Sequence, residues 1–136
     1  RRGLFLNEKE ADQIVREQIE LLNIKTDGMN KKICFLSGGN QQKVVISKWL
    51  ANESKILMMD EPTVGVDIGA KTEIIHVIRQ LADEGNSILI VSSELNELLA
   101  VADRILVFKD GYVINELKRE EIENEEVLQH AIQGYQ

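Results

Sequence analysis

The sequence is 136 residues long, enough for one compact domain, and with 43% apolar and 29% charged residues it has the composition of a globular protein rather than a disordered one. Its formal net charge of −7 argues against nucleic acid as a partner, because such a partner needs a basic surface that neutralises phosphates. A single cysteine excludes an internal disulfide, no Cys/His spacing resembles a zinc site, and no stretch approaches the roughly 20 apolar residues of a membrane span.

The first part of the sequence predicts two helices joined by a polar connector. Residues 4–6 form a strand-like apolar run that is under way without an initiator methionine, so we expect the sequence to be part of a longer chain. Apolar residues then recur with helical spacing over residues 8–23. After a connector broken by Gly28, Ser37 is a good N-cap for a second helix that fades at Asn52.

Two strands and an intervening helix are predicted next. The unbroken apolar run at 56–59, stopped by acids and the only proline, is typical of a strand buried on both faces in a parallel sheet. Asp67 can cap a helix over 68–82, and Gly85 follows its end. A second buried strand at 88–91 completes a strand, helix, strand unit with the usual right-handed crossover.

The last part of the sequence predicts a short helix, a hairpin and an acidic tail. Ser92 or Ser93 can cap the short helix. Strand-like residues 105–108 and 113–114 flank the dipeptide Asp-Gly, which indicates a tight antiparallel turn. Residues 118–133 are acidic and helical in character. The predicted fold class is α/β, with a mostly parallel sheet, flanking helices and a C-terminal β-hairpin.

Asp60 and Glu61 are adjacent acids at the end of a predicted buried strand. Ligands bind at this edge of open α/β sheets, and burying an unpaired charge is costly. Adjacent strand residues point to opposite sides, so a natural division has Asp60 on a Mg²⁺ ion and Glu61 orienting or deprotonating an attacking water. The plain alternative is two exposed acids, but the apolar run before them and the sequence DEPT favour a site.

The sequence LSGGNQQK places Ser37 and two glycines before a helix. Such a helix start presents unpaired main-chain N–H groups and the positive end of the helix dipole, which together can bind an anion. The plain alternative is a loop-to-helix turn capped by serine. A phosphate-gripping GxxxxGK[ST] motif occurs nowhere in the sequence. Without that lysine, the element is better suited to closing over a nucleotide held elsewhere.

The motifs LSGGNQQK, ILMMDEP and VGVD, in this order, resemble the signature, Walker B strand and D-loop of ATP-binding-cassette (ABC) ATPases. The longer forms LSGGNQQKV and DEPTVGVDIGAK are similar to the C-terminal nucleotide-binding domain of duplicated ATPase subunits from bacterial sugar importers of the ribose and galactose type. The resemblance implies a partial P-loop ABC ATPase domain. Its parts would be residues 1–52 with the helical signature subdomain, 53–117 with the Walker B, D-loop and switch core, and 118–136 as the acidic tail.

The resemblance also implies that two nucleotide-binding domains meet head to tail around shared ATP. The residues that would contact the γ-phosphate of ATP on the opposite domain are Ser37, Gly38 and Gly39, with Gln41 close by. Asp60 as a Mg²⁺ ligand and Glu61 as the catalytic residue would instead serve the ATP of their own domain. Asp67 of the D-loop would lie at the contact between the domains.

Three features depart from the family pattern. No Walker A motif is present, so the chain as given is expected neither to hold ATP tightly nor to hydrolyse it alone. Ser93 stands where most active members have a histidine that contacts the γ-phosphate and the attacking water, so the site that uses Glu61 is expected to be weak or inactive. The helix begins almost directly after Leu6, so either a loop near Asn7 and Glu8 is absent or the helical subdomain is trimmed, and we favour the first.

The function implied by the resemblance is ATP hydrolysis coupled to uptake of a monosaccharide, with ATP and Mg²⁺ as cofactors. The partners would be a second ABC domain, a transmembrane permease and, indirectly, a periplasmic sugar-binding protein. The subunit would lie on the cytoplasmic face of the membrane. Two alternatives stay open: a non-transport ABC ATPase of the DNA-repair or chromosome type, and a non-catalytic module that uses an ABC-like half for dimerisation.

Four residues of types that often carry chemistry are not assigned a function. A lone histidine on a helix, such as His76 or His130, is more often a packed or surface residue than a ligand. Cys34 is expected to be a small buried residue. Trp49 is expected in the core, on the helix face that it shares with Val45.

Overall fold

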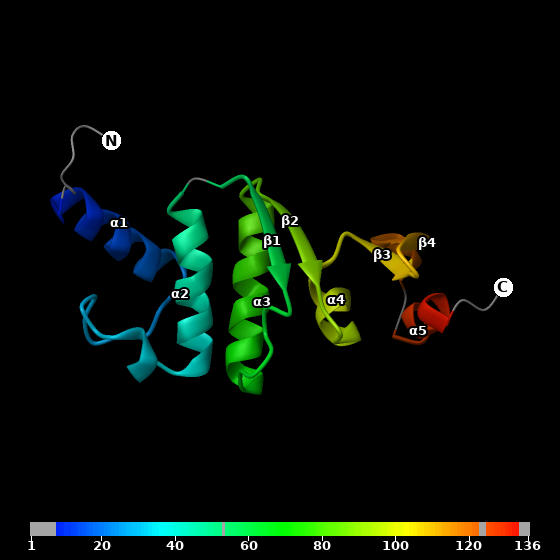
Figure 1. Cartoon of the computed structure of the whole chain (residues 1–136), viewed down its shortest axis with the longest axis horizontal. Helices are drawn as coiled ribbons and strands as arrows, with labels where there is room; N and C mark the ends of the chain where they lie inside the picture. The colour runs from blue at the N-terminus through cyan, green and yellow to red at the C-terminus, as the bar shows by residue number, and fades with distance from the viewer. Residues whose placement is uncertain (1–7, 53, 123–124, 134–136) are drawn as a thin grey trace. The chain divides into compact units, whose positions relative to one another are not determined.

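The computed structural model describes residues 8–52, 54–122 and 125–133 (Figure 1). By its internal contacts the chain divides into a first unit of residues 1–58 and 62–89 and a second unit of residues 59–61 and 90–136. The strand-like run at 4–6 and the suspected loop at Asn7 lie outside the described residues. None of the described helices is long and apolar enough to span a membrane.

Helices make up most of the first unit, and α2 packs against α3 (Figure 1). The helix bounds are α1 Glu8–Leu21, the short 3₁₀ helix η1 Ile33–Phe35, α2 Gly38–Leu50 and α3 Ile68–Asp83. They confirm the three helices predicted from the sequence. α3 begins where Asp67 accepts a hydrogen bond from the Ala70 N–H, and it ends before Gly85, whose φ of +94° favours glycine.

The hydrophobic core of the first unit takes a stripe of side chains from α3 and single side chains from its neighbours. The buried residues of α3 are Ile74, Val77, Ile78 and Leu81, and the others are Leu22, Ile24, Ile46 and Leu57. The stripe on α3 has the spacing of one helix face. The stripe buries one face of α3, and the first turn of this helix lies against the start of α2 where Ala70 meets Gly39.

β1 (Ile56–Asp60) and β2 (Ser87–Val91) pair in a two-stranded sheet. The Ser87 N–H donates to the Lys55 carbonyl at 2.9 Å, and at the other end the Glu61 N–H donates to the Val91 carbonyl at 2.8 Å. Both partners therefore run in the same direction, and the predicted parallel pairing is confirmed (Figure 1).

The prediction that β1 and β2 are buried on both faces is wrong. In β1, Leu57 is 5% exposed, whereas Ile56 and Met58 are 71% and 78% exposed. Alternate residues of β2 are also exposed. Side chains alternate across a strand, and the described part of the first unit covers one face of β1, so every second residue faces outward.

Three side chains expected in the interior are exposed. Trp49 is 56% exposed and Val45 50% exposed, and Cys34 is exposed as well. The prediction is wrong because α2 turns another face inward, the one that carries Gly39 and Ile46. Large apolar residues suggested the wrong face, since a glycine that allows close helix packing adds nothing to a hydrophobic pattern.

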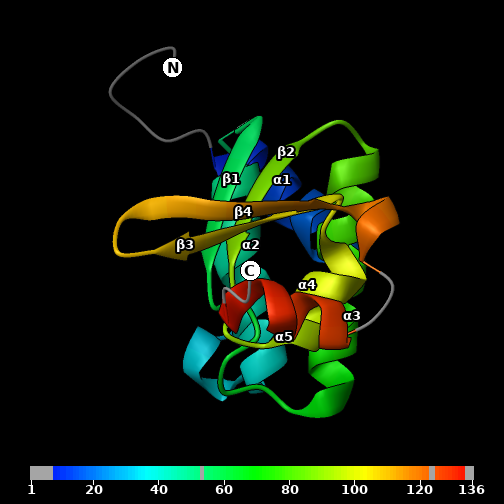
Figure 2. The same ribbon diagram turned by 90° about the vertical axis from the view of Figure 1, so that its right-hand side faces the viewer.

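The second unit contains the predicted hairpin and two helices. The element bounds are α4 Leu95–Val101, β3 Arg104–Lys109, β4 Tyr112–Lys118, the 3₁₀ helix η2 Arg119–Glu121 and α5 Glu125–Gln133. β3 and β4 pair antiparallel, which confirms the hairpin (Figure 2). Asp110 and Gly111 have φ values of +50° and +83°, the two left-handed conformations of a type I′ turn. The helical tail is shorter than predicted because β4 continues through Lys118.

A small apolar cluster stabilises the second unit. Its buried members are Ile105, Ile122 and Leu128, and Leu95, Leu98, Leu99, Ala102 and Leu117 pack against them. These residues come from α4, both strands of the hairpin, the segment after η2 and α5. The cluster therefore anchors the start of α4 and with it the loop of residues 92–94.

Candidate functional site

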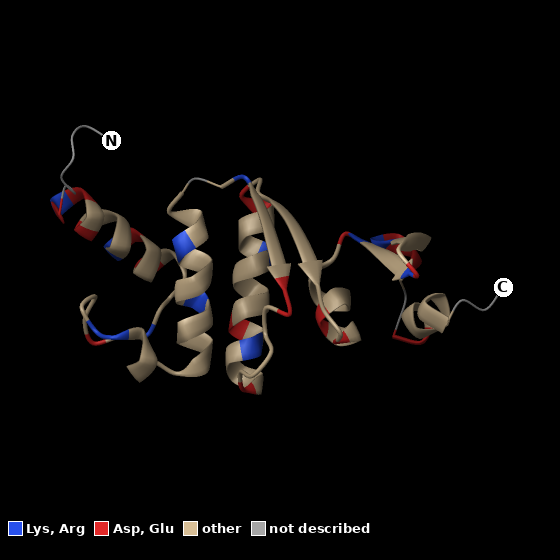
Figure 3. Cartoon of the chain, in the orientation of Figure 1, with Lys and Arg blue, Asp and Glu red and all other residues tan. Residues whose placement is uncertain are grey.

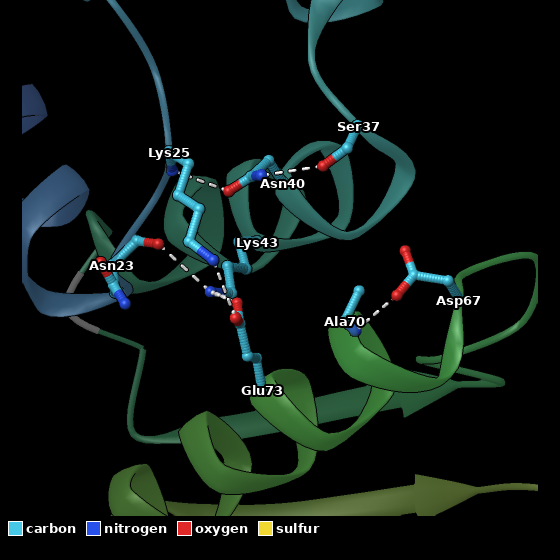
Figure 4. Close-up of polar contacts among 8 residues, drawn as sticks. All are labelled: Asn23, Lys25, Ser37, Asn40, Lys43, Asp67, Ala70 and Glu73. Atoms are coloured by element: carbon cyan, nitrogen blue, oxygen red, sulfur yellow. Dashed lines mark hydrogen bonds and ion pairs between the residues drawn. The ribbon is translucent and has the colours of Figure 1, made fainter.

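Ser37 occupies the N-cap position of α2, but its side chain does not cap the helix. Its backbone is extended, with φ −62° and ψ 156°, and the hydroxyl makes no hydrogen bond to the first-turn N–H groups. Instead the Ser37 Oγ accepts a hydrogen bond from the Asn40 Nδ2 at 2.8 Å (Figure 4). The expected position is right and the expected capping bond is wrong, because Asn40 competes for the hydroxyl oxygen.

Asn40 links the signature motif to the connector after α1. Its Oδ1 accepts a hydrogen bond from the Lys25 main-chain N–H at 2.8 Å, and only 9% of the residue is exposed (Figure 4). Sequence reasoning did not single out this residue. The one available signal was a short amide three residues after the N-cap, and its partner Lys25 lies 15 positions away.

The two signature glycines have different surroundings. A Cβ built on Gly39 would lie 2.3 Å from the Cβ of Ala70, a separation that real side chains do not reach. Gly39 is therefore required for the close crossing of α2 and α3. A Cβ on Gly38 would meet the Gly65 carbonyl at 3.6 Å, which is an ordinary contact. The start of α2 thus lies beside the turn that contains the sequence VGVD.

Gln41 and Asp67 both bind main-chain groups near the start of a helix. The Gln41 Nε2 donates to the Leu36 carbonyl at 2.8 Å, which bends this side chain back over the preceding loop. The exposed Asp67 accepts from the Ala70 N–H through Oδ1 at 2.9 Å (Figure 4). The predicted cap of α3 is confirmed, and its bond fixes the turn next to the signature.

A buried lysine ties α2 to α3. Lys43 is 2% exposed, and its Nζ lies 2.8 Å from the Glu73 Oε2 and 3.2 Å from the Asn23 carbonyl (Figure 4). The Lys25 Nζ lies 3.0 Å from the Glu73 Oε1. The hydrogen bond from Lys43, followed by that from Lys25, holds the pKa of the Glu73 carboxyl below its usual value. Sequence reasoning missed this ion pair, although Lys43 shares its helix face with the buried Ile46.

In the second unit, Asp60 ends β1 and Glu61 follows it. Figure 3 shows this pair as the acidic segment at the end of the β1 arrow. Asp60 is exposed and Glu61 is half-buried. Glu61 has a left-handed backbone, with φ +46°, and its Oε1 accepts a hydrogen bond from the Ser93 main-chain N–H at 2.8 Å. The structure therefore brings Glu61 and Ser93 together, and the contact uses the main chain of Ser93 rather than its side chain.

Ser92 fixes the loop that carries Ser93. Its hydroxyl donates to the Glu97 Oε2 at 2.8 Å and accepts from the Glu94 N–H at 3.1 Å. Glu97 is 3% exposed. The expectation that Ser92 or Ser93 is the N-cap of the short helix is wrong, because Glu94 holds that position without a side-chain cap. The serine instead closes a turn just before the helix.

Within the described ranges, no group of three or more His, Cys, Asp or Glu side chains is placed to hold a metal ion. The carboxylate of Asp60 stands at the exposed strand end. Mg²⁺ commonly takes one or two protein carboxylates and completes its shell with phosphate oxygens and water. This donor set suits a Mg²⁺ ion that arrives with a nucleotide, and it does not suit a dedicated protein-only site.

Comparison with known proteins finds similarity to ABC transporters. A family model described as "ABC transporter" matches residues 5–64. The arabinose import ATP-binding protein AraG of Paraburkholderia xenovorans is 47% identical over 133 residues, or 97% of this chain. The protein of the same name from Burkholderia pseudomallei (strain 1710b) is 49% identical over the same share. The chain is therefore similar to ABC transporter proteins, in the family model over residues 5–64 and in these relatives over nearly its whole length.

Solved ABC cassettes share the fold of this chain. The dimeric ATP-binding cassette MJ0796, solved with ADP and Pi, is 29% identical and has a TM-score of 0.71, and the match covers 88% of this chain and 51% of that cassette. The chain spans about a quarter of the length of the two curated relatives, 26% in each case. The match to cassettes confirms the predicted fold class of a partial ABC ATPase domain.

Proposed function

We propose that this chain forms part of the ATP-binding subunit of an ABC importer for a monosaccharide, and that the complete subunit hydrolyses ATP to drive uptake. The names of the curated relatives, which specify arabinose import, support the transport of a sugar. The family match supports ATP as the nucleotide, and the exposed carboxylate of Asp60 suits Mg²⁺ as its companion ion. A monosaccharide is also the substrate class implied by the sequence motifs.

The observation that carries this proposal is the uncapped start of α2. The Ser37 hydroxyl accepts no hydrogen bond from the main-chain N–H groups of the first turn, and these groups, at Gly38, Gly39 and Asn40, have no acceptor within the helix. The exposed Ser37 lies directly before them. A helix start of this kind attracts an anion through its N–H groups and its dipole.

The anion would be the γ-phosphate of ATP on a second ABC domain. ATP would supply the phosphoryl group that is transferred to water. Its terminal phosphate would be bound and oriented by Ser37, Gly38 and Gly39, and Gln41 would lie at the edge of this phosphate site. In this arrangement the lysine of a GxxxxGK[ST] motif would come from the opposite domain. Asp67 would lie at the contact between the two domains.

Asp60 and Glu61 would serve the nucleotide bound by their own domain. Asp60 would contribute a carboxylate to the Mg²⁺ shell, and Glu61 would orient the attacking water. Ser93 has no imidazole to contact the phosphate and water, so this second site turns over slowly or not at all in our proposal. The chain would then contribute more to its partner's ATP site than to its own.

The proposed partners are a second ABC domain, a transmembrane permease and, through the permease, a periplasmic sugar-binding protein. The dimeric MJ0796 cassette supports the first of these partners. The proposed location is the cytoplasmic face of the membrane, where ATP is available. Nucleic acid is not among the proposed partners, in keeping with the net charge of −7.

Reconstitution of the assembled transporter in proteoliposomes tests the proposal. Ser37→Arg places a bulky side chain at the phosphate position and should reduce ATP-driven sugar uptake and ATP hydrolysis by at least about tenfold. Asn52→Arg is the matched control, because Asn52 is exposed just beyond the other end of α2 and should leave both rates unchanged. Uptake that is unaffected by Ser37→Arg would favour the non-catalytic module, and hydrolysis without sugar uptake would favour the non-transport ATPase.

A further inference from the structure

Asn40 is a buried polar residue whose side-chain amide uses both of its ends. The Lys25 main-chain N–H, 2.8 Å away, can only donate a hydrogen bond, so the amide atom that faces it has to be the oxygen. The other end of the amide is therefore the nitrogen, and it faces the Ser37 Oγ at 2.8 Å. The orientation of the amide follows from its partners and is not an arbitrary choice between oxygen and nitrogen.

This orientation fixes the polarity of the Ser37 hydroxyl. A hydroxyl has one proton to donate and two lone pairs to accept with. The Asn40 Nδ2 can only donate, so one lone pair of Ser37 is occupied and its proton must point elsewhere (Figure 4). The first turn of α2 offers main-chain donors rather than acceptors, and Ser37 is exposed. The hydroxyl is thereby prepared to donate outward.

We propose that Asn40 is a positioning residue that directs the Ser37 hydroxyl proton toward a phosphate oxygen at the start of α2. This inference rests on the proposed function, because it takes ATP on the opposite domain as the anion. Asn40 does not touch the phosphate in this account. It acts through Ser37, and its own anchor is the main chain of the connector after α1.

The anchor of Asn40 is itself rigid. Lys25 donates through its main chain to Asn40 and through its Nζ to Glu73 at 3.0 Å. Two residues earlier, the Asn23 carbonyl accepts from the buried Lys43 at 3.2 Å. The connector is therefore bound to both α2 and α3, and Asn40 has a fixed partner against which to orient.

The sharpest test is Asn40→Asp, which changes one atom and reverses one hydrogen bond. The carboxylate still accepts from the Lys25 N–H, but it cannot donate to Ser37, so the Ser37 hydroxyl turns its proton inward to the carboxylate. In the assembled transporter the equilibrium dissociation constant and the KM for ATP should rise on the order of tenfold or more, the usual weight of a hydrogen bond to a charged group. Asn40→Ala leaves the proton free and should raise both by about threefold at most.

Stability should follow the opposite order. Without nucleotide, Asn40→Ala removes the partner of the Lys25 N–H, so that amide should exchange its hydrogen faster and the Tm should fall. Asn40→Asp keeps this partner and should preserve the protection of the Lys25 amide. A purely structural role for Asn40 would instead make the less stable variant, Asn40→Ala, the one that binds ATP more weakly. That result would overturn the inference.

Two controls separate the possible failures. Asn52→Asp makes the same chemical change just after α2, at an exposed amide that donates to the Lys48 carbonyl, and should leave the affinity for ATP unchanged. In a Ser37→Ala background, Asn40→Asp should add less than about twofold, because the hydroxyl it acts through is gone. A full tenfold effect in that background would indicate simple charge repulsion and refute the role of Asn40. No effect of Ser37→Ala itself would refute the proposed function.

Discussion

Gly39 should be irreplaceable for a packing reason that can be separated from phosphate binding. In Gly39→Ala the new methyl group would lie 2.3 Å from the Cβ of Ala70, whereas non-bonded carbons normally approach to about 3.5 Å. The shortfall of about 1.2 Å cannot be absorbed by a side-chain rotation, because neither methyl group has one. α2 and α3 would have to separate.

The expected loss can be worked from this contact. Overpacking of a core typically costs about 1–3 kcal/mol, and a separation of more than 1 Å along a helix interface favours the upper end of about 3 kcal/mol. Replacing glycine by alanine inside a helix returns about 1 kcal/mol. The free energy of unfolding should therefore fall by about 2 kcal/mol, as measured by urea denaturation followed by circular dichroism.

A compensating substitution and a matched control make the test decisive. In Gly39→Ala combined with Ala70→Gly, the methyl group moves from one helix to the other, and stability should return to within about 1 kcal/mol of the starting protein. The next atom, the Ala70 Cα, is 3.5 Å from the new Cβ. Gly38→Ala, whose Cβ would meet nothing closer than 3.6 Å, should cost no stability. Equal losses for Gly38→Ala and Gly39→Ala, or no recovery in the double variant, would refute the packing argument.

Three further predictions concern stability. Lys43 and Lys25 lower the pKa of the Glu73 carboxyl in the folded state. The stability that the charged Glu73 contributes is therefore complete above the unfolded-state pKa of about 4.3 and is lost as the pH falls through the lower folded-state pKa. Glu73→Gln should reduce the difference in unfolding free energy between about pH 6 and about pH 3. Asp67→Ala should cost about 1 kcal/mol through loss of the α3 cap, while Asp67→Asn, which keeps an acceptor oxygen, should stay close to wild type in thermal unfolding. Gly111→Ala should cost about 1 kcal/mol because alanine must then adopt a φ of +83°, and unchanged amide exchange in β3 and β4 would contradict this.

The elements were predictable where their signals are local. The cap at Asp67 and the Asp-Gly turn each depend on residues within a few positions of one another, and both are confirmed. Helical spacing likewise located α3 to within one residue. These features are encoded in short stretches, so a single sequence is sufficient to find them.

The inward faces were less predictable, because they depend on what packs against them. Trp49 and Val45 looked like core residues by hydrophobicity, yet α2 turns Gly39 and Lys43 inward. A glycine shows its packing role only once the opposing Ala70 is known, and a buried lysine needs its partner carboxylate. The same holds for the strands, since an apolar run such as that of β1 does not reveal which of its faces is covered.

The candidate site shows the same division between local and distant information. The motifs predicted that Ser37 precedes a helix and that Asp60 and Glu61 lie at the end of a strand, and the structure places them so, while their roles stay predictions. The bond that orients Ser37, from Asn40, depends in turn on Lys25, which is 15 residues away from Asn40. The hydrogen bond between Lys25 and Asn40 cannot be deduced from sequence spacing, because the connector between these residues shows no helical or strand pattern.

The hydrogen bond from Ser93 to Glu61 has a consequence for how this site can change over evolution. Its donor is a main-chain N–H, which every residue except proline possesses. The Glu61 carboxylate can therefore keep this hydrogen bond with any residue except proline at position 93. A substitution of Ser93 by histidine would therefore add an imidazole while this main-chain hydrogen bond stays in place.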